Sequence, residues 1–286
     1  MLTKEQFHSL CPVLLDGATG SNLQKAGMPR GCCTEMWILE HPDALLSLQK
    51  QYVEAGSNIL YAPTFQAQPI ALQKVGLEKE TESINARLVA LSKSVASNVL
   101  VAGNLTTLAA FTDSFDEENF DLLVENYRRQ IRGLMDGGAD LLAAETLLYP
   151  LEAEAILTAA ELEGAGATLY TFTMQSDGSL LSGREAGPVL RELEKAGAAA
   201  VGFNCVAADS FTPGLVSKLK RYVKGPLVCK PNAGNPTIGA DGIPVYPMAA
   251  EEFADIMKDC VAMGARVLGG CCGTSPEFIR AIKESV

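Results

Sequence analysis

The sequence predicts a (β/α)8 barrel, in which eight parallel strands alternate with eight helices. One short sequence pattern recurs along the chain. A glycine and a small residue follow a helical pattern and precede an apolar run, as in Gly138-Ala139 before LLAAET and Gly264-Ala265 before VLGGCC. The glycine suits the left-handed end of a helix, and continuous apolar runs are typical of parallel strands covered on both faces. Successive strands lie about 30–40 residues apart, which is the size of one βα unit.

The strands are assigned in chain order from the apolar runs. The second, fourth, sixth and eighth runs follow the recurring glycine pattern, at Gly56, Gly138, Gly197 and Gly264. The other four are apolar runs of the same kind that lie between helical patterns. Short apolar runs bounded in this way predict buried strands. The predicted strands are 13–16, 58–62, 99–103, 140–145, 168–174, 199–204, 227–231 and 266–270.

Patterns rich in Ala, Leu, Glu and Lys separate the strands and predict the helices. His41-Pro42 opens the first of them. The predicted helices are 42–55, 79–96, 116–136, 150–163, 186–196, 209–222, 249–263 and 276–284. Eight such units favour the closed barrel. An open doubly wound sheet is the alternative, but the turn DGATGSNL after the first strand lacks the glycine spacing of a dinucleotide-binding loop.

Composition restricts the class of function. Apolar residues make up 48% of the chain, and the formal charge is −11 without a Lys/Arg cluster, which argues against a nucleic-acid binder. The chain has no run of 18 apolar residues, so no membrane span is expected. The polar start MLTKEQFHSL does not resemble a secretory signal. We therefore expect a cytoplasmic protein whose residues 1–286 form one barrel domain.

Three cysteines are predicted to meet at one rim of the barrel. In this fold catalytic residues lie at the carboxyl ends of the strands, and side chains from alternate strands share a layer. Cys205 ends the sixth strand, and Cys271 and Cys272 end the eighth. The glycines around this pair allow the backbone to turn both thiols inward. Three converging thiolates match an open zinc site, and open zinc sites are catalytic ones.

The other cysteines have a simpler interpretation. A free cysteine often serves as a small buried hydrophobe, and this use is preferred for Cys229 and Cys260, while Cys11 lies at the opposite rim. A redox or lid role for the adjacent pair Cys32-Cys33, in the loop after the first strand, stays open. Structural disulfides are not expected in a reducing cytoplasm.

An open zinc site with three thiolates suggests a thiol substrate. A free thiol titrates near ~8.5 and is mostly protonated at neutral pH, whereas coordination to zinc removes the proton. Such a reaction needs no histidine base, and neither His8 nor His41 is expected at the rim. A Schiff-base enzyme using Lys230 is the weaker hypothesis, because it would leave the thiols unexplained.

Asp16 and Glu145 each end an apolar strand, where a carboxylate is costly unless it is paired or accessible. They predict capture of an ammonium group, with a salt bridge or loop cap as the structural alternative. The small residues Gly17, Ala18 and Thr19 offer backbone N–H groups that can bind a carboxylate. Recognition of a thiol, an ammonium group and a carboxylate together describes a thiol amino acid.

The motifs that carry these residues resemble the homocysteine S-methyltransferase family. They are DGATGSNL, TEMW, HPDALLSLQKQYVEAGSNILYAPTF, GADLLAAET, GFNC, KPNAGNP and GGCCGTSPEFI, which span about residues 12–282. The pattern is most similar to the homocysteine module of cobalamin-dependent methionine synthases. The resemblance implies methylation of homocysteine to methionine, with zinc held by Cys205, Cys271 and Cys272.

The resemblance also implies a substrate site. The amino group of homocysteine would lie near Asp16 and Glu145 and its carboxylate near the loop Gly17–Thr19. The predicted substrate-binding residues are Asp16, Gly17, Ala18, Thr19, Thr64, Phe65, Glu145 and Asn204.

The methyl donor is less well defined. The segments TFQA at 64–67, GNLT at 103–106 and FTMQ at 172–175 differ from the methionine synthase pattern on the rim that faces the donor. One barrel accounts for the whole chain, and the Asp-x-His-x-x-Gly pattern that binds cobalamin is absent from the sequence. We therefore expect methylcobalamin to arrive on a separate corrinoid protein. The alternative is S-methylmethionine, S-adenosylmethionine or a betaine that binds directly.

Two further hypotheses remain at this point. The chain could be a non-catalytic zinc-binding partner subunit that keeps the barrel. It could also carry out the same chemistry on another acceptor, such as a coenzyme thiol or selenohomocysteine.

Overall fold

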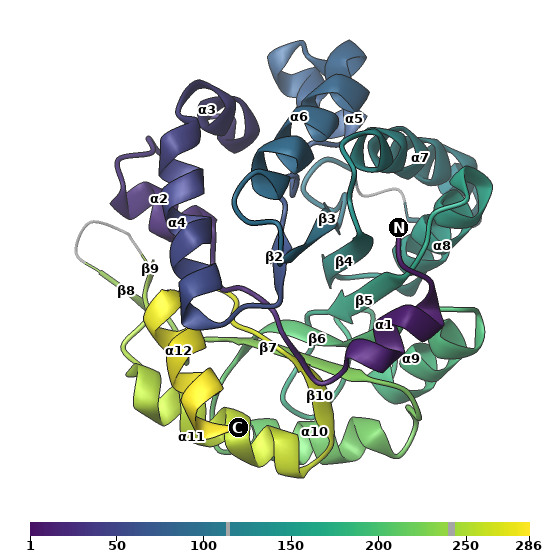
Figure 1. The fold of residues 1–286 in the computed structure, drawn as a ribbon. Helices are drawn as coiled ribbons and strands as arrows, with labels where there is room; N and C mark the ends of the chain where they lie inside the picture. The colour runs from purple at the N-terminus through teal and green to yellow at the C-terminus, as the bar shows by residue number, and fades with distance from the viewer. Residues whose placement is uncertain (113–114, 240–243) are drawn as a thin grey trace.

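The computed structural model describes residues 1–112, 115–239 and 244–286 and contains one eight-stranded parallel sheet. Its strands lie in the order β1-β10-β7-β6-β5-β4-β3-β2, and Figure 1 shows them inside a ring of helices. The strands are Val13–Leu14 (β1), Ile59–Tyr61 (β2), Leu100–Thr106 (β3), Leu141–Leu147 (β4), Thr168–Phe172 (β5), Ala200–Ala207 (β6), Leu227–Asn232 (β7) and Ala265–Leu268 (β10).

The sheet closes on itself. β1 and β2 stand at the two ends of the hydrogen-bonded order, and a parallel bridge between Leu15 and Ile59 joins them. The predicted (β/α)8 barrel is confirmed, because all seven neighbouring strand pairs are parallel and the ends meet. All eight predicted strands are present, with bounds that differ by up to three residues.

Each predicted helix is also present. The eight are Pro42–Ala55 (α4), Thr81–Lys93 (α6), Phe120–Asp136 (α7), Pro150–Glu163 (α8), Ala186–Lys195 (α9), Thr212–Lys220 (α10), Ala250–Ala262 (α11) and Pro276–Ser285 (α12). Local signals set the bounds of α4 and α8. Both begin with proline, and both end at a glycine in the left-handed conformation, Gly56 and Gly164.

The structure adds elements that the sequence patterns did not predict. They are the helices Lys4–Leu10 (α1), Gly20–Lys25 (α2), Thr34–Glu40 (α3) and Pro69–Leu72 (α5), three single 3-10 turns, and an antiparallel pair, Thr237–Ile238 (β8) and Pro244–Val245 (β9). None of the helices in the described part of the chain has the length and apolar character needed to cross a bilayer.

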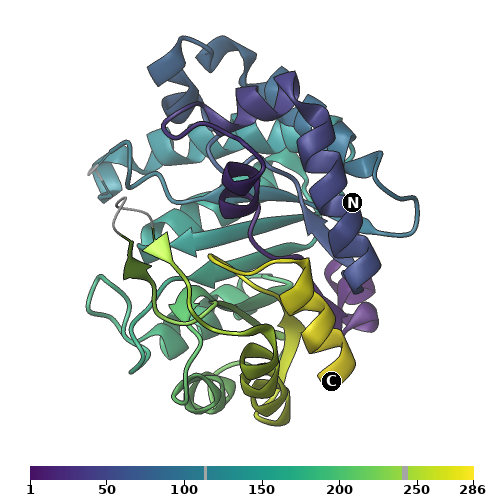
Figure 2. The same cartoon turned by 90° about the vertical axis from the view of Figure 1, so that its left-hand side faces the viewer.

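The two ends of the barrel differ in the elements that lie there and in the polarity of their side chains. Figure 2 shows the strand arrowheads and the β8–β9 pair at one end and α1 at the other. Phe7 of α1 belongs to the same buried cluster as Val13, Ile59 and Val228, which lie inside the barrel. An apolar side chain therefore closes the amino-terminal end, and the polar chemistry is left to the end where the strands finish.

Candidate active site

The structure brings three thiols together at the carboxyl end of the barrel. Cys205 lies in β6, and Cys271 and Cys272 follow β10. The three sulfur atoms lie within 4.8 Å of one another, and Cys205 Sγ is 3.9 Å from Cys272 Sγ. Two thiolates on one tetrahedral zinc ion lie about 3.8 Å apart, given Zn–S bonds of ~2.3 Å. The donor set and its spacing therefore fit a zinc ion.

An unusual backbone conformation directs Cys205 into this cluster. Its φ of 57° lies in the left-handed region, and Thr146, at the end of β4, has a φ of 58°. Such angles are costly for residues other than glycine and occur mainly at functional sites. The pairing register shifts next to both residues, between β4 and β5 and between β6 and β7. We expected Gly269, Gly270 and Gly273 to provide the turn, and of these only Gly273 has a positive φ.

The pKa values of the clustered thiols shift in different directions. Hydrogen bonds from Cys205 and Cys271 lower the pKa of Cys272 to about 3, and a hydrogen bond from Tyr246 contributes in the same direction. Hydrogen bonds to Cys271 and Cys272, followed by burial, raise the pKa of Cys205.

A cavity of about 360 Å³ opens beside the thiols. It is lined by Asp16, Gly17, Ala18, Thr19, Gly20, Ser21, Thr34, Glu35, Tyr61, Ala62, Pro63, Phe65, Gln66, Asn104, Glu145, Thr146, Cys205, Lys230, Cys271 and Cys272. Most of the predicted substrate residues are in this lining. Thr64 and Asn204 are fully buried instead. Thr64 Oγ1 donates to Asn104 O (2.8 Å), and Asn204 Nδ2 donates to Glu145 Oε2 (3.3 Å).

Glu145 is held by a buried ion pair. Lys230 Nζ lies 3.1 Å from Glu145 Oε2, and Asn104 Nδ2 donates to Glu145 Oε1 at 3.0 Å. Burial acts to lower the pKa of Lys230, but the charge of Glu145, together with smaller contributions from the other acidic groups around the amine, raises it and keeps the amine protonated. A protonated amine is not a nucleophile, so the geometry speaks against a Schiff-base role for Lys230.

Asp16 has fewer hydrogen-bond partners than Glu145. Its Oδ2 accepts from Tyr61 N (2.8 Å), while Oδ1 is buried and has no hydrogen-bond partner among the described residues. Burial raises the pKa of Asp16 to about 7, although the charge of Lys230 opposes that shift. An ammonium group in the cavity would supply the missing partner.

The loop after β1 differs in detail from the expectation. The N–H of Ala18 already donates to Thr274 Oγ1 (3.2 Å), so it is engaged within the protein. Gly17 has no room for a side chain, because a Cβ there would lie 2.7 Å from Thr274 Oγ1. The neighbouring Ser21, which the sequence analysis did not single out, lines the cavity with a buried hydroxyl that has no partner among the described residues.

Glu35 is a third cavity carboxylate that the sequence analysis missed. It is 2% exposed, its Oε1 accepts from Gln66 N (2.8 Å), and Cys33 Sγ lies 3.7 Å from its Oε2. Glu35 thereby ties α3 to the loop after β2. The motif TEMW contained this residue, but only the packing of the two loops places it at the cavity.

The other thiols and the histidines lie elsewhere. Cys229 and Cys260 are fully buried in the main hydrophobic cluster, as expected for small apolar side chains. His8 contacts Ala199 O at 2.7 Å. His41 stacks on Trp37, so neither ring is part of the cavity lining.

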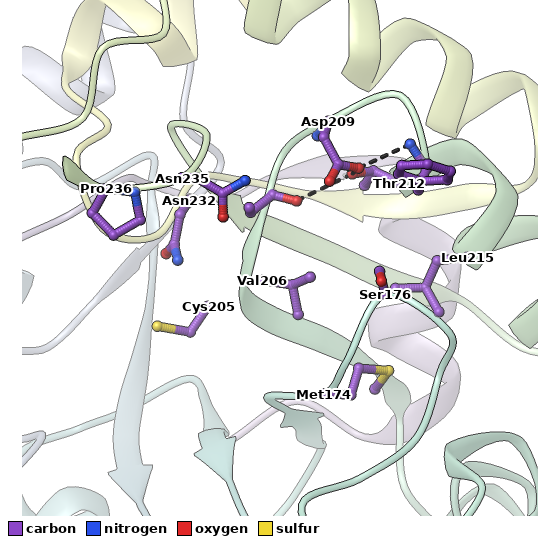
Figure 3. A pocket seen from close by; sticks show the side chains of 12 residues that line it. Met174, Ser176, Cys205, Val206, Asp209, Thr212, Leu215, Asn232, Asn235 and Pro236 are labelled. Carbon is purple, nitrogen blue, oxygen red and sulfur yellow. Dashed lines mark hydrogen bonds between the residues drawn. The ribbon is translucent and has the colours of Figure 1, made fainter.

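A second cavity, of about 440 Å³, lies on the other side of Cys205. Figure 3 shows Cys205 at its edge, with the sulfur directed away from Met174 and Leu215. Asp209 in this cavity accepts a hydrogen bond from Phe211 N, directly before α10. Cys205 thus separates two cavities, and its sulfur belongs to the one that contains the carboxylates.

Asp16→Asn should change the pH dependence of stability. The folded-state pKa of about 7 exceeds the unfolded value near 3.8, so the native state binds more protons and loses stability as the pH rises through this window. In zinc-free protein, urea unfolding from pH 4 to 8 should show wild type losing stability relative to the variant up to about pH 7. Parallel stability curves for the two proteins would refute the raised pKa.

Comparison with known proteins agrees with this geometry. The profile of the homocysteine S-methyltransferase family matches residues 13–286, nearly the whole chain. The chain belongs to the homocysteine S-methyltransferase family. Members that it resembles include the methionine synthases of Mycobacterium leprae, 27% identical over 289 residues, and Mycobacterium tuberculosis, 28% identical over 290 residues. In each case the alignment covers 95% of this chain and 24% of the relative, so this homocysteine S-methyltransferase family member spans about a quarter of their length.

Solved structures of this family match over the full barrel. The homocysteine methyltransferase MmuM from Escherichia coli aligns in its oxidized form with a TM-score of 0.82 and in its metallated form with 0.80. Both alignments are 26% identical and cover 96% of each chain. The methyltransferase family predicted from the motifs is therefore confirmed.

Proposed function

We propose that this chain binds zinc through Cys205, Cys271 and Cys272 and methylates homocysteine to methionine. The observation that carries the proposal is that the three thiols and the carboxylates of Asp16 and Glu145 line one cavity. The metallated form of the similar MmuM supports a metal at such a site. When bound, zinc would hold the substrate sulfur as a thiolate at neutral pH.

The chain's own residues would orient the amino acid. Asp16 Oδ1 is a free acceptor for the ammonium group among the described residues, and Glu145, which lines the same cavity, adds negative charge that Lys230 partly compensates. Ser21 offers an unused hydroxyl to the carboxylate, next to the loop Gly17–Thr19. Binding at both ends of the amino acid would position its sulfur at the thiols.

Homocysteine binding should release about one proton at pH 7, because an ordinary thiol titrates near ~8.5 and must lose its proton to bind the metal. Calorimetry in buffers of different ionisation enthalpy measures this release, which should fall as the pH rises above the free thiol's pKa. X-ray absorption at the zinc edge should change from three sulfur ligands to four. Methionine, which carries no thiol proton, is the control. Three sulfurs at saturating homocysteine, with no proton released, would favour a non-catalytic partner subunit.

We further propose that the methyl group arrives as methylcobalamin on a separate corrinoid protein. The β8–β9 pair and the loops at the carboxyl end of the barrel expose large apolar side chains, which suits a protein partner better than a small cation. These are Leu181 (59% exposed), Phe211 (68%), Ile238 (71%) and Val245 (49%).

Turnover assays can separate the donors. Purified protein should form methionine from homocysteine with a methylcobalamin-loaded corrinoid protein and not with S-methylmethionine, S-adenosylmethionine or a betaine. Activity with one of these small donors would replace the corrinoid protein as the donor and leave the acceptor assignment in place. A metal centre of reduced thiols is also consistent with the proposed cytoplasmic location.

A further inference from the structure

The lining of the cavity beside the thiols contains buried polar atoms that lack a hydrogen-bond partner. Among the described residues, three such side-chain oxygens belong to this lining, Asp16 Oδ1, Ser21 Oγ and Asn104 Oδ1. Asn104 is not among the predicted substrate-binding residues, since its segment GNLT was expected on the rim that faces the methyl donor. A buried polar atom without a partner is costly, so a ligand that donates hydrogen bonds is expected at Asn104 Oδ1.

Glu145 fixes the orientation of the Asn104 amide. Asn104 Nδ2 donates to Glu145 Oε1 (3.0 Å), so the amide oxygen is turned away from that carboxylate. Exchanging the oxygen and nitrogen of the amide would place two acceptors against each other. The amide therefore offers an acceptor, and not a donor, to a ligand in the cavity.

Thr64 holds the backbone of Asn104 in place. Its hydroxyl donates to Asn104 O (2.8 Å) and accepts from Asn104 N (3.0 Å). Gln130 Nε2 donates to the same carbonyl oxygen at 3.3 Å. Because Thr64 and Gln130 are both fully buried, contacts inside the protein set the position of Asn104 before any ligand binds.

The carboxylate of Glu145 has little capacity left for a ligand. A carboxylate accepts about four hydrogen bonds, and Glu145 already accepts from Asn104, Asn204 and Lys230. Asp16 Oδ1 and Asn104 Oδ1 have no such partners. An amide at position 104 also provides a second acceptor without adding a third negative charge beside Asp16 and Glu145.

We propose that Asn104 binds the ammonium group of the substrate together with Asp16, each through its unpartnered oxygen, and that Glu145 and Thr64 are positioning residues for Asn104. An ammonium group carries three N–H donors, so one such group can satisfy both oxygens. This inference deepens the proposed function and rests on it, because the ammonium group is that of the proposed homocysteine.

Removing the amino group from the ligand isolates this contact. 4-Sulfanylbutanoate has the thiol and the carboxylate of homocysteine but no ammonium group, so the ratio of the two dissociation constants measures recognition of the ammonium group. In zinc-loaded Asn104→Ala, the preference for homocysteine should fall by about ten- to a hundredfold relative to wild type, as for a lost hydrogen bond to a charged group. Isothermal titration calorimetry measures both constants.

Asn104→Asp separates contact with the ligand from support of Glu145. Aspartate keeps an acceptor at the same place but cannot donate an amide N–H to Glu145, so this variant should retain most of the preference for homocysteine. Equal losses in Asn104→Ala and Asn104→Asp would overturn the proposal, because Asn104 would then act only as a donor to Glu145.

Asn126→Ala is the matched control. Asn126 is a buried amide on α7, outside the cavity lining, and its Oδ1 already accepts from Ile70 N (3.1 Å). Its replacement should leave the preference for homocysteine unchanged. A loss as large as that in Asn104→Ala would show a general effect of removing a buried amide and would also overturn the proposal.

Methionine separates this inference from the proposed function. If wild type does not bind homocysteine, the proposed acceptor fails. The same variants are then compared, in zinc-free protein, with methionine and with 4-(methylsulfanyl)butanoate, its analogue without the amino group. The preference for methionine should again fall in Asn104→Ala and persist in Asn104→Asp. A wild type that does not prefer methionine to this analogue would refute the pair of acceptors.

Discussion

Replacing Cys205 with serine should remove most of the zinc, of which we expect the unaltered protein to hold about one ion per chain. Serine keeps the size of the side chain but does not supply a thiolate, and the two remaining sulfurs, Cys271 and Cys272, come from adjacent residues on one loop. Metal analysis of the purified variant measures the loss directly. The barrel should stay folded, because it closes through strand pairing on both sides of β6 and not through the metal.

Cys11→Ser is the matched control for this experiment. Cys11 is a free, half-buried thiol at the opposite end of the barrel, where its Sγ lies 3.6 Å from Phe7 O. Its replacement should leave the zinc content unchanged. Full zinc in Cys205→Ser, or equal losses in the two variants, would show that the cluster does not hold the metal.

Lys230→Met should destabilise the fold by about 3–5 kcal/mol, because it leaves Glu145 as an uncompensated buried carboxylate. Both members of the pair are almost completely buried, with side-chain exposures of 4% and 8%. Urea unfolding at pH 7 measures the free energy of unfolding. The double variant Lys230→Met/Glu145→Gln should recover much of the loss, since it removes the unpaired charge.

The same variants test the role of Glu145 in substrate binding. If Glu145 also attracts the ammonium group, the double variant should bind homocysteine about ten- to a hundredfold more weakly, as for a lost hydrogen bond to a charged partner. A thiol that lacks the amino group should lose much less affinity. A single Lys230→Met variant as stable as wild type would mean that the ion pair contributes nothing measurable.

Local sequence was sufficient to predict the bounds of a helix where a single residue at each end determines them. The bounds of α4 and α8 agree with the predicted 42–55 and 150–163, because proline starts each helix and a left-handed glycine ends it. The short helices α2, α3 and α5 were missed. With only four to seven residues each, they show too little periodicity to be recognised and depend on packing against the rest of the barrel.

The residues of the candidate site also fall into two groups, those that the sequence predicted and those that it did not. Cys205, Cys271, Cys272, Asp16 and Glu145 could be predicted because each stands at a strand end, and the barrel sends all strand ends to one rim. Ser21 and Glu35 could not, because they lie on short helices whose approach to the cavity depends on loop packing. The Lys230–Glu145 ion pair joins residues 85 positions apart on β7 and β4, so no local pattern carries it.

By itself, the sequence determined the barrel and the convergence of the three thiols, because periodicity and strand order are properties of the chain. Only the tertiary structure decided how each group is used. It turned Cys205 inward through a left-handed backbone that only surrounding contacts can impose. It also paired Glu145 with Lys230 and left Asp16 Oδ1 free. The physical reason is that protonation, pairing and strain depend on distances of a few ångströms between residues far apart in the chain.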